Sequence, residues 1–136
     1  MISRISISCL CFALSLLAMG SQTMFAVRTP YNVAMNAGSG DRDYYYVYRD
    51  ILPGLVKKFR PDIILVSAGY DINASDPLSN IYITSEGMRN IIRGILLRST
   101  TTYLPLMPYV FVLEGGYDFD SLSKSVYITI KELLED

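Results

Sequence analysis

The sequence predicts an α/β domain in which a parallel sheet packs against helices. The stretches RPDIILVSAG and PYVFVLEGG each hold a short, continuous apolar run. A run without alternation fits a strand that is covered on both faces, as in a parallel sheet. Segments with apolar residues at helical spacing lie before, between and after these two stretches. Strands and helices that alternate in this way are typical of parallel α/β folds.

Length and composition indicate one globular domain. The chain has 136 residues, of which 51% are hydrophobic and 18% are charged. That length accommodates one domain, and the composition is unlike that of a disordered chain. With 12 basic and 13 acidic residues the net charge is −1, and no basic patch stands out. We therefore expect no direct nucleic-acid binding through phosphate contacts.

The inventory of reactive side chains is narrow. The sequence contains no histidine, which removes the commonest general base and the commonest zinc ligand. Cys9 and Cys11 are the two cysteines, and both lie in the first dozen residues. This position of the cysteines argues against a disulfide framework and against a zinc–thiolate cluster.

The N-terminal stretch MISRISISCLCFALSLLAMGSQTMFA has the layout of a secretory signal peptide. Arg4 precedes an apolar run over residues 5–19, and residues 18–20 offer a small-x-small cleavage site. Secretory entry is the localisation that this favours. The alternatives are a sequence artefact upstream of the domain and a buried or interfacial helix. The run is shorter than the ~20 residues of a spanning helix, so we expect no stable membrane span.

The first helix is expected to follow the loop in NVAMNAGSGD, with Asp41 as a capping residue. Pro53 is expected to kink this helix or to end it early. We interpret the apolar stripe as a packing face and not as an aromatic binding surface. The stripe consists of Tyr44, Tyr48, Ile51, Leu55 and Phe59.

Two further helices are predicted after residue 83. Thr84 or Ser85 is the expected N-cap of the first, with Glu86 in its first turn. Their apolar faces are Met88, Ile91, Ile92, Ile95 and Leu96, and then Leu122, Val126, Ile130 and Leu133. Two strands, with a short third one near Asn32, make a small sheet for a parallel fold. The segment therefore resembles the last part of a larger sheet.

Unusual polar loops follow both predicted strands. Asp71 and Asp76 follow the first strand, and EGGY, which ends at Tyr117, follows the second. Ligands of open α/β sheets bind beyond the carboxyl ends of the strands, so both loops are expected at one rim. Each loop also has a structural interpretation. SAGYD can be a helix cap or an Asx turn, and EGGY a tight turn that needs glycine.

Taken together, these motifs resemble the C-terminal third of a zinc-dependent histone deacetylase. The branches closest in pattern are class II and the acetoin-utilisation type. NVAMNAGSGD is similar to the family's N-V-P-L-x-x-G-x-G-D. FRPDIILVSAGYDINASDPLSN is similar to F-x-P-D/E-hydrophobic-V-S-A-G-F-D-x4-D-P-L-G, and ITSEGM and VLEGGYDFDSLSKSV continue the series. The resemblance covers residues 32–136. It leaves residues 1–31 as a signal-peptide-like or non-homologous segment.

The resemblance implies the C-terminal part of a three-layer, parallel-sheet arginase/deacetylase fold and a set of site residues. It makes Asp71 one of three protein ligands to a catalytic Zn²⁺. It makes Tyr117 the hydrogen-bond donor to the developing oxyanion. Leu78, Gly115 and Gly116 become substrate-binding residues that line a narrow channel. Asp76, in contrast, is expected to hold its loop by hydrogen bonds.

The departures from the family pattern concern the chemistry. The family takes its other two zinc ligands from Asp-x-His and its general acid/base pair from His-His, and this chain has no histidine. The first hypothesis is therefore a partial deacetylase-family protein, inactive alone, either truncated biologically or through an incomplete gene model. By descent its partners are an acetylated lysine of a histone or other protein, or a small acetylated amine. Its localisation would be the nucleus or cytoplasm.

The second hypothesis is a non-catalytic, secreted or interaction module, that is, a pseudoenzyme built on the same segment. The signal-like N-terminus favours this second hypothesis. The retention of Asp71 and Tyr117 favours the first, because a pseudoenzyme has little physical reason to keep a desolvated carboxylate and a positioned phenol.

Overall fold

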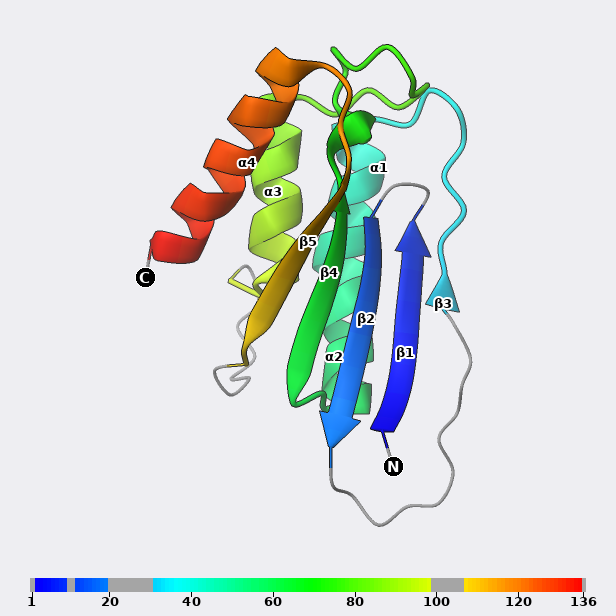
Figure 1. Cartoon of the computed structure of the whole chain (residues 1–136). Helices are drawn as coiled ribbons and strands as arrows, with labels where there is room; N and C mark the ends of the chain where they lie inside the picture. The colour runs from blue at the N-terminus through cyan, green and yellow to red at the C-terminus, as the bar shows by residue number, and fades with distance from the viewer. Residues whose placement is uncertain (1, 10–11, 20–30, 99–106, 136) are drawn as a thin grey trace.

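A computed structural model describes residues 2–9, 12–19, 31–98 and 107–135. Within these residues one mixed sheet of five strands has the order β3-β1-β2-β4-β5 (Figure 1). The strands are β1 (Ile2–Cys9), β2 (Phe12–Met19), β3 (Tyr31–Asn32), β4 (Ile63–Gly69) and β5 (Tyr109–Gly115). The two strands expected from the apolar runs are thus β4 and β5, and the short strand expected near Asn32 is β3.

The pairing of β4 with β5 is parallel, as predicted, and runs from Ile64 opposite Tyr109 to Gly69 opposite Gly115. The sheet nevertheless contains antiparallel pairs, because β1 and β2 form a hairpin and β2 pairs antiparallel with β4. Residues 2–9 and 12–19 are therefore strands, and the alternative of a helix in this stretch is wrong. The signal-peptide assignment and the boundary at Asn32 stay predictions.

The first helical segment is interrupted by a wider turn. It consists of α1 (Asp41–Tyr46), the π-helical turn η1 (Val47–Ile51) and α2 (Leu52–Phe59). Pro53 lies in the first turn of α2, where a missing N–H is tolerated, and the segment continues past it. The π turn adds one residue, so that Leu52 and Val56 are buried, while the predicted Ile51 and Leu55 are partly buried and pack against the same core.

The remaining helices begin at side-chain caps. Thr84 caps α3 (Ser85–Ile95) by accepting the N–H of Gly87 at 3.1 Å, which confirms one of the two predicted caps. Asp118 caps α4 (Phe119–Leu134) by accepting the N–H of Ser121 at 2.8 Å. Hydrogen bonds from the backbone and the side chain of Ser121 lower the pKa of Asp118.

The prediction that Asp41 caps its own helix is wrong. Gly40 is the N-cap of α1. The carboxylate of Asp41 instead accepts the N–H of Thr84 at 2.8 Å and its hydroxyl at 2.6 Å. Asp41 therefore ties the start of α1 to the start of α3.

The core lies between one face of the sheet and the helices. Ile64, Val66 and Ala68 on β4 are buried there, under α1, α2 and α3 (Figure 1). On the other face Val110 and Val112 of β5 are exposed, and no helix of the described ranges covers them. No helix in this part of the chain is long and apolar enough to cross a membrane. The carboxyl ends of β4 and β5 point to the same end of the molecule and carry the two loops that the sequence singled out.

Candidate functional site

The loops after β4 and β5 meet at the rim of the sheet. Asp71 lies in a short 3₁₀ turn, η2 (Tyr70–Ile72), directly after β4. Gly115 ends β5 and is paired with Gly69. A β-carbon placed on Gly115 would lie 3.1 Å from the carboxyl carbon of Asp71. The prediction that both loops share one rim is therefore confirmed.

The carboxylate of Asp71 has an unsatisfied oxygen. Its Oδ1 atom is buried and has no hydrogen-bond partner in the described residues. A buried carboxylate oxygen without a partner is destabilising, so it needs an explanation, such as an ion or ligand that binds there. A helix cap or an Asx turn would give such an oxygen a backbone N–H, which is what Asp76 has and Oδ1 of Asp71 lacks.

Asp76 holds the rim together, as expected for a residue that fixes its loop. Its side chain is buried, and Oδ1 accepts the N–H of Leu78 at 2.9 Å. Oδ2 crosses to the other loop and accepts the N–H groups of Tyr117 at 2.6 Å and Asp118 at 3.3 Å. The expected bonds within the loop are present, and the bonds to the second loop go beyond that expectation.

Gly115 and Gly116 of the second loop are each required to be glycine for a different structural reason. A side chain on Gly115 would crowd the Asp71 carboxylate. Gly116 has φ of +130°, and a β-carbon there would lie 2.8 Å from Cδ1 of Leu122. Gly115 thus leaves room beside the carboxylate, and Gly116 allows a backbone conformation that residues with side chains rarely adopt.

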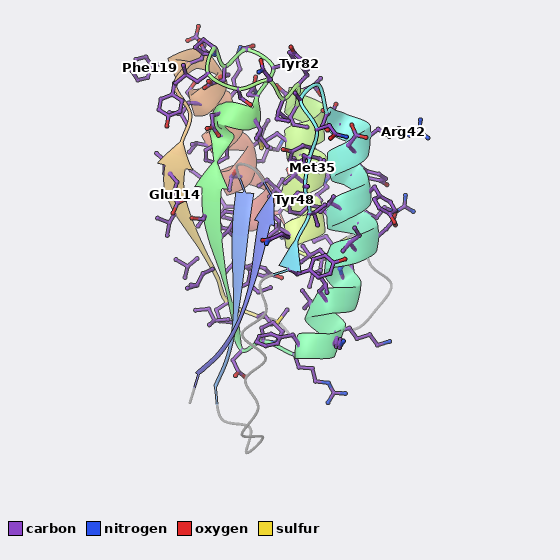
Figure 2. All side chains as sticks on the ribbon, turned by 90° about the vertical axis from the view of Figure 1, so that its right-hand side faces the viewer. Met35, Arg42, Tyr48, Tyr82, Glu114 and Phe119 are labelled. Atoms are coloured by element: carbon purple, nitrogen blue, oxygen red, sulfur yellow. The ribbon has the colours of Figure 1, made fainter. Side chains whose placement is uncertain are left out.

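Apolar and aromatic side chains surround this rim. Tyr117 is 55% exposed and Leu78 is 69% exposed. Tyr82 and Phe119 are also exposed and lie at the same end of the molecule, beyond the tips of β4 and β5 (Figure 2). The structure therefore brings Asp71, Leu78, Gly115, Gly116 and Tyr117 to one end, and their chemical roles stay predictions.

Sequence reasoning missed Tyr70, which connects the rim to α4. Its ring is buried, and its hydroxyl lies 2.9 Å from Oγ1 of Thr129. Burial raises the pKa of Tyr70, and the bond to Thr129 offsets part of that effect. The one available signal was a hydroxyl-bearing aromatic at the end of an apolar strand. Its partner, 59 positions away, had no signal of its own.

A zinc ion fits this site only in part. A carboxylate oxygen is a suitable zinc ligand, and the unpartnered Oδ1 of Asp71 is placed to be one. A catalytic zinc needs three protein ligands, however, and no group of three or more His, Cys, Asp or Glu side chains gathers within the described residues. These residues provide one ligand and not a complete metal site.

Comparison with known sequences gives a consistent result. The profile of the histone deacetylase domain matches residues 20–133, a range that begins ahead of the boundary predicted at Asn32. Histone deacetylase 14, chloroplastic, of Arabidopsis thaliana is 38% identical over 78% of this chain and 25% of its own length. Polyamine deacetylase HDAC10 of Homo sapiens is 32% identical over 82% of this chain and 15% of its own length. The chain therefore spans a quarter or less of these relatives.

Solved structures show the same likeness. The crystal structure of the HDA15 HD domain is similar with a TM-score of 0.66 at 30% identity, and the match covers 79% of this chain and 30% of that one. An acetylpolyamine aminohydrolase from Burkholderia pseudomallei shares the fold, with a TM-score of 0.65 at 24% identity over 78% of this chain and 29% of that one.

Proposed function

Because the chain belongs to the histone deacetylase family and has part of the arginase/deacetylase fold, we propose that it carries one part of an amide-hydrolase site. In this proposal Asp71 is a metal ligand and Tyr117 donates a hydrogen bond to the carbonyl oxygen of the substrate. The chain alone does not hydrolyse acetyl-amides. The observation that carries the proposal is the buried, unpartnered Oδ1 of Asp71 beside Gly115.

The geometry supports the role of Tyr117 indirectly. A donor that stabilises a developing oxyanion acts best when its position is fixed before the reaction. The N–H of Tyr117 is held by Asp76, and the backbone of Gly116 before it lies against Leu122 and Tyr70. The exposed phenol ring is therefore attached to a backbone with little freedom, at the same rim as Asp71.

The substrate class follows from the family. Relatives include proteins named histone deacetylases and a polyamine deacetylase, so the acyl donor is an acetylated lysine of a histone or other protein, or a small acetylated amine. Leu78, Gly115 and Gly116 would line the passage to the reacting carbonyl. Zinc, when bound in the family, polarises that carbonyl and lowers the pKa of a bound water.

The lack of activity follows from the inventory of side chains. Hydrolysis needs a group that takes a proton from the attacking water, and the family uses a pair of histidines for this step. This sequence contains no histidine. Asp71 and Asp76 do not substitute for them, since Asp71 is the proposed ligand and Asp76 is occupied by three backbone N–H groups.

A second candidate function is a non-catalytic interaction module, secreted if the signal-like N-terminus is used. It is favoured by exposed apolar side chains in two places: Val110 and Val112 on the uncovered sheet face, and Tyr127, Ile130 and Leu134 on α4. Contiguous exposed apolar surface marks protein–protein interaction sites. This candidate predicts partner binding without any dependence on a metal.

Turnover measurements separate the two candidates. The purified chain should show no chelator-sensitive release of acetate from acetyl-lysine peptides or acetylated polyamines. A chimera should show it, if the region of a deacetylase relative that bears Asp-x-His and His-His is joined ahead of Asn32. Activity of the chain alone would contradict the proposed inactivity. A folded chimera without zinc or turnover would favour the interaction module.

A further inference from the structure

Tyr70 forms a hydrogen bond whose direction can be assigned. The hydroxyl of Thr129 donates to the carbonyl oxygen of Ser125 at 3.0 Å, one turn earlier in α4. A threonine hydroxyl has a single hydrogen to donate, so toward Tyr70, at 2.9 Å, Thr129 is an acceptor. The phenol of Tyr70 is therefore the donor, and both oxygens are buried.

This bond lies next to the proposed metal ligand. Tyr70 directly precedes Asp71 in η2. On the other side of Asp71, the side-chain amide of Asn73 donates to Oγ of Ser125 at a longer distance of 3.5 Å. Asp71 is thus bracketed by two side chains that reach α4, and their partners lie one helical turn apart.

Tyr70 also contacts the second loop. A β-carbon on Gly116 would lie 3.3 Å from Cβ of Tyr70, so the backbone of Gly116 rests against the base of this side chain. Tyr117 follows Gly116 directly. One buried side chain therefore touches the segment of Asp71, the segment of Tyr117 and α4.

We propose that Tyr70 is a positioning residue, which fixes the carboxylate of Asp71 and the turn before Tyr117 through the bond of its hydroxyl to Thr129. The family pattern that this stretch resembles has phenylalanine at the position of Tyr70, so the hydroxyl is an additional constraint. The importance of this positioning for metal binding rests on the proposed function. The positioning itself does not.

Amide hydrogen exchange on the full chain tests the positioning. The reporters are hydrogen-bonded amides of the rim, those of Asn73, Ala74 and Tyr117, and the reference is the amide of Arg60 at the end of α2. Tyr70→Phe removes the hydroxyl and keeps the ring. We expect the rim amides to exchange about three- to tenfold faster, the effect of one lost hydrogen bond, with Arg60 unchanged.

Variants of the acceptor keep the test valid if Tyr70→Phe folds poorly. Thr129→Val removes the acceptor of this bond, so it should accelerate the rim amides by a similar factor. Thr129→Ser keeps the hydroxyl and should exchange like the wild type. The double variant Tyr70→Phe/Thr129→Val should be no worse than Thr129→Val, because both changes remove the same bond.

Thr84→Ala is the matched control for a general loss of stability. It removes the N-cap of α3, and the side-chain hydrogen bonds of Thr84 go to Asp41 and Gly87, not to Tyr70 or Thr129. It should leave the exchange rate of the Tyr117 amide, relative to that of Arg60, unchanged; the Ala74 amide is left out of this control because it is bonded to Ile83, next to Thr84. Equal acceleration of the rim and of Arg60 in Tyr70→Phe would overturn the proposal, and so would a Thr129→Ser variant that behaves like Thr129→Val.

A cobalt titration separates this proposal from the proposed function. Co²⁺ takes the same types of ligand as Zn²⁺, and its paramagnetism perturbs the signals of nearby amides. In the chimera that carries Asp-x-His and His-His, Co²⁺ should perturb the Ile72 and Gly115 amides if Asp71 is a ligand, and Asp71→Asn should abolish the effect. Loss of the cobalt result with a local exchange effect rejects the metal role alone. A cobalt effect at Asp71 without the exchange effect rejects the positioning alone.

Discussion

Oδ2 of Asp76 accepts the backbone N–H of Tyr117 at 2.6 Å and joins the loop after β4 to the loop after β5. Oδ1 of the same side chain accepts the N–H of Leu78 at 2.9 Å. One buried carboxylate therefore sets the relative position of the two loops that carry the candidate site.

Replacing Asp76 by asparagine should lower stability. The amide has one acceptor oxygen, and its NH₂ group would face a backbone N–H where the second oxygen had been. We expect Asp76→Asn to lower the free energy of unfolding by about 1–3 kcal/mol in urea titrations. Asp120→Asn, on the exposed first turn of α4, is the control and should change it by less than about 0.5 kcal/mol. Equal effects of both changes would show that the cross-loop bonds are not important.

Gly116 and Gly54 should respond to alanine in opposite directions. Gly116 has positive φ and contacts Leu122, so Gly116→Ala should lower the free energy of unfolding by about 1–3 kcal/mol. Gly54 lies in α2 with no atom within 4 Å of an added β-carbon, so Gly54→Ala should raise it by roughly 0.5–1 kcal/mol. Thermal melts of both variants provide the measurement. A neutral Gly116→Ala would contradict the described turn.

The ion pairs that join α3 to α4 should respond differently to the loss of the arginines and to the loss of the glutamate charge. Glu132 is 2% exposed and binds Arg89 at 3.3 Å and Arg93 at 2.9 Å, and the hydrogen bond that Arg93 donates to Glu132 raises the pKa of Arg93. The arginines are 34% and 46% exposed, so water can solvate them when the glutamate is gone.

Removing the arginines should therefore be worse than removing the carboxylate charge. We expect Glu132→Gln to lower the free energy of unfolding by about 1 kcal/mol. Arg89→Met/Arg93→Met should lower it by about 3 kcal/mol, because a buried carboxylate is left unpaired. Chemical denaturation near neutral pH measures both. A larger loss in Glu132→Gln than in Arg89→Met/Arg93→Met would contradict the burial of the Glu132 carboxylate.

Alkaline pH should destabilise the fold through Tyr109. Burial raises the pKa of Tyr109 to about 12, from 10.0 for an ordinary tyrosine. Between these values the unfolded chain releases this proton and the folded chain keeps it, so the stabilisation present below pH 10 is lost as the pH rises to about 12. Tyr109→Phe should flatten the fall in melting temperature over that range. Tyr127→Phe, on the exposed face of α4, should leave it unchanged.

The predictable parts of the fold were those with strong local patterns. The apolar runs predicted β4 and β5, and Thr84 marked the start of α3. The π turn before Pro53 was not predictable, since a 3.6-residue period cannot anticipate an extra residue, and Leu52 is buried more deeply than the predicted Ile51. The antiparallel pair of β1 and β2 was missed because its apolar run also fits a signal peptide.

The site was predictable to a similar degree. The order of the motifs placed Asp71 and Tyr117 at one rim, since the carboxyl ends of parallel strands meet. Contacts between distant segments carried no local signal. The bonds from Asp76 to the second loop and from Tyr70 to Thr129 are of this kind. So is the reach of Asp41 to Thr84.

The most direct test of the proposed site is the zinc content of the chimera that restores Asp-x-His and His-His. Asp71→Ala should abolish tight zinc binding together with turnover, because it removes one of three ligands. Tyr117→Phe should keep zinc and slow turnover by ~10²–10³-fold, the usual effect of losing one oxyanion donor. Asp76→Asn should keep zinc and mainly lower stability. Full zinc occupancy in Asp71→Ala would contradict the assignment of Asp71 as a ligand.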